Sequence, residues 1–96
     1  MLFRIAVDGA LALEGPANFR QFAIMLSADA PADAALARLG RRDGAHIWIT
    51  PAAIRALLPT PPDRAWEEGF AAMLAFATTR GWVDEAGAIR AHIEAA

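Results

Sequence analysis

The chain has 96 residues, a net charge of −2 and no cysteine, and its nine basic residues are all arginines. We expect a single compact domain over residues 1–96, and the lack of thiols excludes disulfides, zinc–thiolate sites and iron–sulfur clusters. Charges near the start and the absence of a long uncharged apolar run argue against a signal peptide and a membrane span, so we expect a cytoplasmic protein.

The N-terminal segment predicts a β-hairpin. Residues 2–7 and 10–13 flank Asp8-Gly9, a dipeptide that tolerates the positive backbone angles of a tight turn. Residues 15–29 then allow two interpretations. Pro16 and the spacing of the apolar residues are typical of a helix, whereas the run FAIML would also suit a buried strand. We expect the helix, because the turn chemistry that precedes this segment is a helix-start signal.

A short helix and a strand are expected in the middle of the chain. Residues 29–39 carry aspartates in the first turn and a proline near the start, and Gly40 with the arginines after it marks the end, so this segment predicts a helix. Residues 41–44 are expected to form a loop. Residues 45–49 place two isoleucines on one side and a histidine and a tryptophan on the other, as in a strand.

Two Thr-Pro pairs predict the starts of two more helices. Thr50-Pro51 and Thr60-Pro61 each combine a hydroxyl N-cap with a proline at the first helical position. The first pair predicts a short helix that ends near Leu58. The second predicts the longest helix, over about residues 61–80, with an apolar stripe along one side and a glycine as its terminator.

The tail, residues 81–94, allows both a helix and a strand. Counted by threes and fours, its apolar residues share one side of a helix, but that helix would contain Gly87 at a cost of about 1 kcal/mol relative to alanine. Counted by twos, residues 88–94 alternate, with His92 in the polar row. We favour the strand, because the residues up to Gly87 then form a turn. Residues around His46 and His92 have the same side-chain order, so the two segments are candidates for one sheet.

Together these elements predict an α+β fold. We expect a small, mainly antiparallel sheet that combines the N-terminal hairpin, a strand at 45–49 and a strand at 88–94. Three or four helices, the longest over about 61–80, are expected to pack against it. The apolar fraction of 56%, much of it alanine, is enough for one core and leaves apolar surface for a partner, which favours a homodimer.

The sequence contains no recognisable catalytic, nucleotide-binding or metal-binding motif. His46 is the main candidate for an acid or base, because it follows Arg41 and Arg42, which could hold an anion. The competing interpretation is a solvent-facing histidine paired across a strand. His92 is a second candidate, provided that its strand lies beside that of His46. No metal site or cofactor is expected, and the arginines form no basic stripe for nucleic acid.

Trp48 and Trp82 are the candidate interface residues, since an exposed tryptophan suits a dimer or partner surface. The alternative is that helices cover both sheet faces and bury Trp48. The leading hypothesis is therefore a small accessory or protein-interaction module that forms a homodimer and has no catalysis of its own. The second is a cofactor-free enzyme or ligand-binding protein for an anionic metabolite, with His46 as acid/base and Arg41 or Arg42 as the anion clamp.

Overall fold

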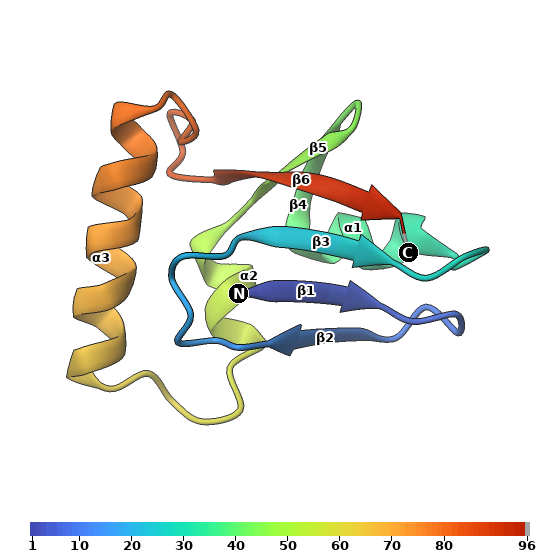
Figure 1. The fold of residues 1–96 in the computed structure, drawn as a ribbon, viewed down its shortest axis with the longest axis horizontal. Helices are drawn as coiled ribbons and strands as arrows, with labels where there is room; N and C mark the ends of the chain where they lie inside the picture. Colours follow the sequence, from blue (N-terminus) through green and yellow to red (C-terminus); the bar gives the residue numbers. More distant parts are fainter. Residues whose placement is uncertain (96) are drawn as a thin grey trace.

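The chain forms a small α+β fold with one sheet, in a computed structural model that describes residues 1–95. Along the chain the elements are β1 (Leu2–Ile5), β2 (Leu11–Glu14), β3 (Ala23–Leu26), α1 (Ala32–Leu39), β4 (Gly40–Asp43), β5 (His46–Ile49), α2 (Pro51–Ala56), α3 (Arg64–Thr79) and β6 (Ile89–Ala95). The six strands lie in the order β2-β1-β3-β6-β5-β4 (Figure 1).

The sheet is mixed, which corrects the prediction of a mainly antiparallel sheet with three or four helices. β3 pairs in parallel with both β1 and β6, while the pairs β1–β2, β4–β5 and β5–β6 are antiparallel. Within residues 1–95 there are three helices, and the helix expected at residues 15–29 is not among them.

Residues 15–26 form turns and then strand β3, because local backbone and side-chain hydrogen bonds of a turn replace the helical ones. The amide of Asn18 donates to the Gly15 carbonyl at 2.9 Å, and the side chain of Asn18 accepts from the Arg20 amide at 3.2 Å. Asparagine side chains that bond nearby amides in this way compete with a helix. The apolar run that follows pairs with β1 on one side and β6 on the other, and within it Ile24 is fully inaccessible to solvent while its neighbours are half-buried.

Residues 40–43 form edge strand β4, where a loop was expected. β4 pairs with β5 through a tight connection in which Gly44 has a φ of 62°, a backbone angle that favours glycine. The predicted strand at 45–49 is confirmed as β5. The charged side chains of β4 concealed its strand character in the sequence, but such charges are typical of a sheet edge, where they oppose pairing with other chains.

The strand interpretation of the tail is confirmed by β6. Gly81 ends α3 at a φ of 75°, and the Trp82 amide donates back to the Ala77 carbonyl at 3.0 Å. The carboxylate of Asp84 then accepts from the amides of residues 86 and 88, which closes the turn that leads into β6. The last strand of the chain therefore enters the sheet between β3 and β5.

Helix α2 begins where its capping signal predicts, whereas α3 begins a few residues later than expected. The Thr50 hydroxyl caps α2 by accepting from the Ala53 amide at 3.2 Å, as the sequence predicts. The longest helix, expected from about residue 61, instead begins at Arg64, because the Asp63 carboxylate caps it by accepting from the Trp66 amide at 2.8 Å. Aspartate at the N-cap therefore determines the start of α3 in place of Thr60.

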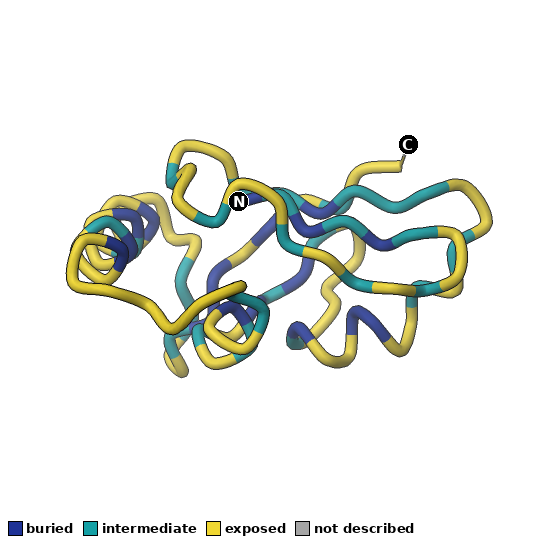
Figure 2. The backbone as a smooth tube through the Cα atoms, turned by 90° about the horizontal axis from the view of Figure 1, so that it is seen from below, coloured by how far each residue is buried: buried dark blue, intermediate teal, exposed yellow. Residues whose placement is uncertain are grey.

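The helices cover one face of the sheet and one end of its strands. α1 and α2 lie against one face (Figure 2), and α3 crosses the end of the sheet beside the start of β6 (Figure 1). The core between these layers includes Phe3, Ile5, Ile24, Leu36, Leu39, Ile47, Ile49, Ile54, Trp66, Phe70 and Ile89. No helix of residues 1–95 covers the opposite face, where the outward side chains of β6 are exposed.

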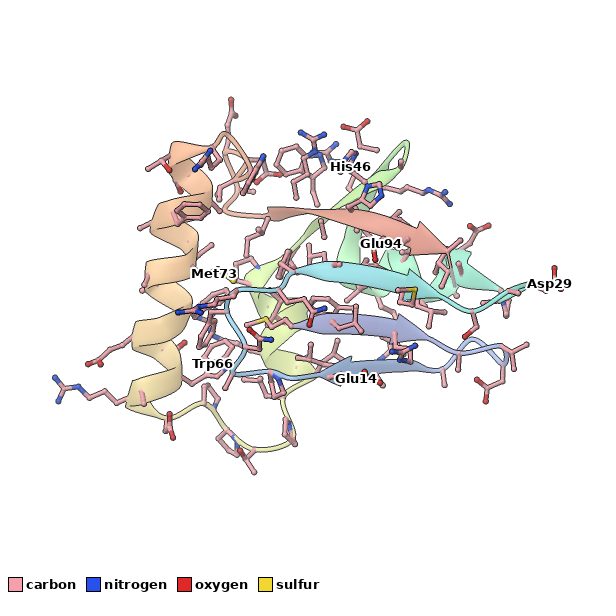
Figure 3. All side chains as sticks on the ribbon, viewed as in Figure 1. Glu14, Asp29, His46, Trp66, Met73 and Glu94 are labelled. Atoms are coloured by element: carbon pink, nitrogen blue, oxygen red, sulfur yellow. The ribbon has the colours of Figure 1, made fainter. Side chains whose placement is uncertain are left out.

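α3 approaches the 15–22 segment closely at Gly69. A Cβ atom on Gly69 would lie 2.3 Å from Cε2 of Phe19, so the missing side chain makes room for the phenyl ring. The Phe19 ring also packs against Trp66 of α3, at 5.9 Å between ring centroids. Trp66 and Met73 both project from α3 toward the sheet (Figure 3). This contact fixes the distance between α3 and the segment that precedes β3.

We predict that Gly69→Ala destabilises the wild-type protein but stabilises a Phe19→Ala background. In the wild type the new methyl group displaces the ring, at a cost of about 1–3 kcal/mol. In the Phe19→Ala background the clash is absent, and the gain in helix propensity contributes about 1 kcal/mol. Urea denaturation of the four proteins measures the difference. An equal effect of Gly69→Ala in both backgrounds would contradict the proposed contact.

Candidate functional site

His46 and His92 lie opposite each other on the uncovered face of the sheet. The antiparallel register of β5 and β6 pairs His46 with His92 and Trp48 with Arg90. The two imidazole rings meet edge to face, with centroids 5.2 Å apart and an interplanar angle of 62°. In the same register Ile47 pairs with Ala91, and both of these side chains face the core. His92 was a second candidate for acid or base on the condition that its strand lies beside that of His46, and the pairing of β5 with β6 meets this condition.

Arg90 places a positive charge directly beside the His46 ring. Its Nη2 atom lies 3.4 Å from Nδ1 and 3.3 Å from Nε2 of His46. The two ring nitrogens point in different directions in the plane of the ring, so a guanidinium N–H at nearly the same distance from both aligns well with neither. In the neutral ring one of these nitrogens accepts a hydrogen bond and the other donates one. Both nitrogens of His46 are therefore poorly used by Arg90 and stay available to a ligand.

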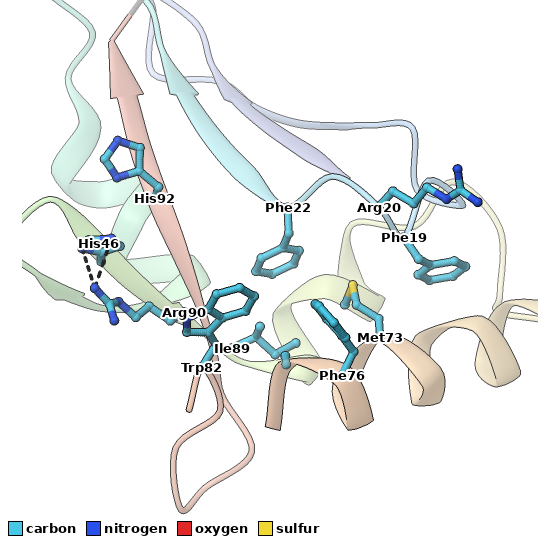
Figure 4. A pocket seen from close by; sticks show the side chains of 11 residues that line it. Phe19, Arg20, Phe22, His46, Met73, Phe76, Trp82, Ile89, Arg90 and His92 are labelled. Atoms are coloured by element: carbon cyan, nitrogen blue, oxygen red, sulfur yellow. Dashed lines mark hydrogen bonds between the residues drawn. The ribbon is translucent and has the colours of Figure 1, made fainter. Parts of the chain in front are cut away.

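A cavity of about 390 Å³ opens next to these three residues. Its walls come from the 15–22 segment, from α3 and the residues after it, and from β5 and β6, and they are lined by Phe19, Arg20, Phe22, His46, Met73, Phe76, Ala77, Trp82, Ile89, Arg90 and His92. Figure 4 shows Arg90 and His46 on one side of the cavity, Arg20 on the other, and aromatic rings between them. The cavity is an apolar space with cationic groups at its rim.

The surroundings of His46 favour its neutral form. Partial burial, followed by the positive charges of Arg90 and of His92 when protonated, lowers the pKa of His46, and Asp43 partly offsets this. The His46 imidazole therefore stays neutral down to a lower pH than an ordinary histidine does. The free energy of unfolding accordingly decreases as the pH falls below the ordinary pKa of histidine, because the unfolded chain takes up this proton more readily.

Arg41 and Arg42 lie outside the lining of the cavity. The Arg41 guanidinium lies over the Trp48 ring, 5.6 Å from its centroid, and pairs with Asp84 at 3.6 Å. Arg42 is the β4 partner of Ile47, on the opposite side of the strand from His46, and its Nε donates to the Gly44 carbonyl at 3.1 Å. The arginines that the structure brings to the cavity are Arg20 and Arg90.

The two tryptophans proposed as interface residues lie in different surroundings. Trp48 is half-buried on the uncovered sheet face, and its indole Nε1 donates to Asp43 at 3.4 Å. Trp82 is 40% exposed and meets Phe76, which is 54% exposed, edge to face at 6.1 Å. Both of these last two residues line the cavity, so this aromatic pair stands at its mouth.

A second cavity, of about 350 Å³, lies between the 15–22 segment and the proline-rich corner before α3. Its lining includes Trp66, Leu58 and four prolines, but neither a histidine nor an arginine. The indole Nε1 of Trp66 donates to the Pro16 carbonyl at 2.9 Å, which ties the two walls together. This second cavity offers apolar contact without a cation.

A search for metal sites and membrane-spanning helices, and a comparison with known proteins, assign no further function to this chain. Among residues 1–95 no three histidine, aspartate or glutamate side chains are arranged to hold a metal ion. None of the helices in that range has the length and apolar character needed to cross a membrane. Comparison with known protein families, curated proteins and solved structures finds no match for this chain.

Both arginines of the cavity and all its aromatic residues except Trp82, which was named as a candidate interface residue, were not predicted from the sequence. Arg90 stood out only as a neighbour of His92 in the polar row of the tail, and that alternation was the one signal that could have placed it on the face of His46. Arg20, Phe22 and Phe76 carried no such signal, because they reach the cavity from segments whose pairing is not encoded locally.

We predict that Arg90→Gln raises the pKa of His46, because it removes a positive charge that opposes protonation. The rise is partial, since burial still favours the neutral ring. Arg41→Gln is the matched control, because Arg41 is not among the groups that shift His46. Titration of the imidazole Cε1 proton by NMR measures both variants. An unchanged His46 in Arg90→Gln would show that the two side chains do not interact in solution.

Proposed function

We propose that this protein binds a small organic anion with an apolar body in the cavity beside Arg90. The observation that carries the proposal is the position of Arg90 and His46 at the rim of an otherwise aromatic and aliphatic cavity. The volume of about 390 Å³ falls in the range of small-molecule sites, which are mostly apolar with a few polar groups that orient the ligand.

The charge of Arg90 supports an anionic ligand. Arg4, Arg41, Arg55 and Arg64 each have an acidic partner, whereas Arg90 is one of five arginines that form no ion pair with a carboxylate of residues 1–95. Arg20, the other arginine of the cavity, is also among these five. Its nearest polar neighbour is an imidazole that is predominantly neutral. A guanidinium without a counter-ion, beside an apolar surface, suits a carboxylate, sulfonate or phosphate group.

The same arrangement would also serve a cofactor-free enzyme that acts on an anionic metabolite. In this form of the proposal His46 is the acid or base, because its ring nitrogens are available beside the cavity. Arg90 takes the role of the anion clamp that the sequence analysis gave to Arg41 or Arg42, and His92 lies close enough to influence the protonation of His46.

Binding of 8-anilinonaphthalene-1-sulfonate, an aromatic anion whose fluorescence rises in apolar surroundings, tests the proposal. We expect saturable binding that Arg90→Gln weakens about tenfold, the effect of losing one charged contact at a partly exposed site. Arg41→Gln, which removes an arginine outside the cavity, is the control and should bind like the wild type. No binding, or equal losses in both variants, would refute an anion site at Arg90.

A second candidate function is self-association through the uncovered sheet face. Strands β1, β3 and β6 run parallel, and parallel strands are rarely left with a bare face. Trp48 lies half-buried on this face, and Trp82 is exposed at the edge of the cavity. A second copy of the chain is the proposed occupant, because an apolar fraction of 56% is high for a small monomer.

Sedimentation velocity over a range of concentrations tests this second candidate. We expect a dimer that Trp48→Ala weakens by about tenfold or more, as for a central interface residue, while circular dichroism shows the fold retained. Trp82→Glu tests the other edge of the surface in the same way. A wild-type protein that stays monomeric at all concentrations would refute the proposal of a homodimeric module.

A further inference from the structure

We infer that binding of an anion at Arg90 is coupled to uptake of a proton by His46, so that the site holds its ligand more tightly in acid than in alkaline solution. The inference rests on the proposed anion site and adds its regulation. The geometry that supports it is the contact between the Arg90 guanidinium and the His46 ring at the rim of the cavity.

The charged groups around His46 come from three parts of the chain. From β6, Arg90 and His92 both face the ring, and Glu94 is the next outward residue of that strand. From β4, Asp43 is the cross-strand partner of His46 and is also bonded by the Trp48 indole. Arg20 lies across the cavity. Arginines therefore dominate the cavity side of the ring, and Asp43, the carboxylate that acts on His46, lies on the side of β4.

An anion that binds at Arg90 reverses the balance of charge at His46. Without a ligand, the guanidinium 3.3 Å from Nε2 opposes a second positive charge on the ring. An anionic group held by Arg90 lies within a few ångströms of the same ring, offsets the guanidinium and can accept a hydrogen bond from the imidazolium. Protonation of His46 is therefore easier in the complex than in the free protein.

Thermodynamic linkage turns this difference into a dependence of affinity on pH. If the bound anion favours the imidazolium, the imidazolium must favour the bound anion by the same factor. In the free protein the pKa of His46 is lowered by burial, by Arg90 and by His92. A bound anion raises this pKa, so affinity increases as the pH falls through the range between the free and the bound values.

The geometry selects His46 over His92 as the proton acceptor. His46 contacts Arg90 directly and is half-buried, whereas His92 is exposed and contacts the His46 ring edge to face. Each nitrogen of His46 is also poorly aligned with Arg90, which leaves a position for a bond from the ring to the ligand.

The test uses 8-anilinonaphthalene-1-sulfonate, since its sulfonate stays ionised at all the pH values used and any dependence on pH belongs to the protein. We expect the wild type to bind about tenfold more tightly near pH 5.5 than near pH 8, a typical coupling between two ligands. His46→Gln should lose this ratio, and His92→Gln should keep most of it. Calorimetry in two buffers with different heats of ionisation should show net proton uptake by the wild type.

The outcomes separate this inference from the proposal on which it depends. Binding that is weakened by Arg90→Gln but shows no pH dependence and no proton uptake would overturn the coupling and leave the anion site intact. A ratio that disappears in His92→Gln but persists in His46→Gln would overturn the assignment to His46. Absence of binding in the wild type would overturn both proposals. NMR titration of His46 with and without the probe gives the same answer should a variant fail to fold.

Discussion

The insertion of β6 between β3 and β5 is the interaction on which the rest of the structure depends. Without β6 the strands would form two separate ribbons, β2-β1-β3 and β5-β4. β6 joins them by pairing in parallel with β3 and antiparallel with β5. It is formed by the last residues that the structure describes, so the sheet is complete only when the tail has paired with strands that lie far away in the sequence.

The same pairing creates both the core and the candidate site, because side chains alternate along β6. Ile89 and Ala91 face the helices and are almost fully buried. Arg90 and His92 project from the uncovered face, where they are the cross-strand neighbours of Trp48 and His46. A slip of one residue would exchange these two sets and expose the core. The turn closed by the Asp84 carboxylate fixes the start of β6 and therefore holds the register.

Local signals in the sequence were sufficient for most of the elements, but not for β3, for β4 or for the arrangement of the strands. The Asp8-Gly9 hairpin, the Thr50 cap and the strand at 88–94 follow from turn and capping chemistry within a few residues, and the structure contains all three. The parallel pairing of β3 could not be predicted, because its partners are β1 and β6. Pro16 led to the wrong prediction of a helix over residues 15–29, because a proline suits a turn equally well. The hydrogen bonds of Asn18 stabilise the turn instead.

Of the residues at the candidate site, only the two histidines and Trp82 could be named from the sequence. Both histidines occur in outward positions of alternating segments, which permitted the pairing that the register of β5 and β6 provides. The cavity depends on three distant parts of the chain, and Phe19 in its wall packs against α3 at Gly69. A cavity of this kind results from the packing of distant segments, so it cannot be predicted from the periodicity of the sequence.

The most direct test of an anion site at Arg90 is to locate a bound aromatic anion within the protein. Intermolecular NOEs between 8-anilinonaphthalene-1-sulfonate and methyl-labelled protein report which cavity the ligand enters. We expect NOEs to the methyl groups of Ile89 and Met73, which line the cavity beside Arg90. NOEs to Leu58 in the cavity that lacks a cation, with none to Ile89, would contradict an anion site at Arg90.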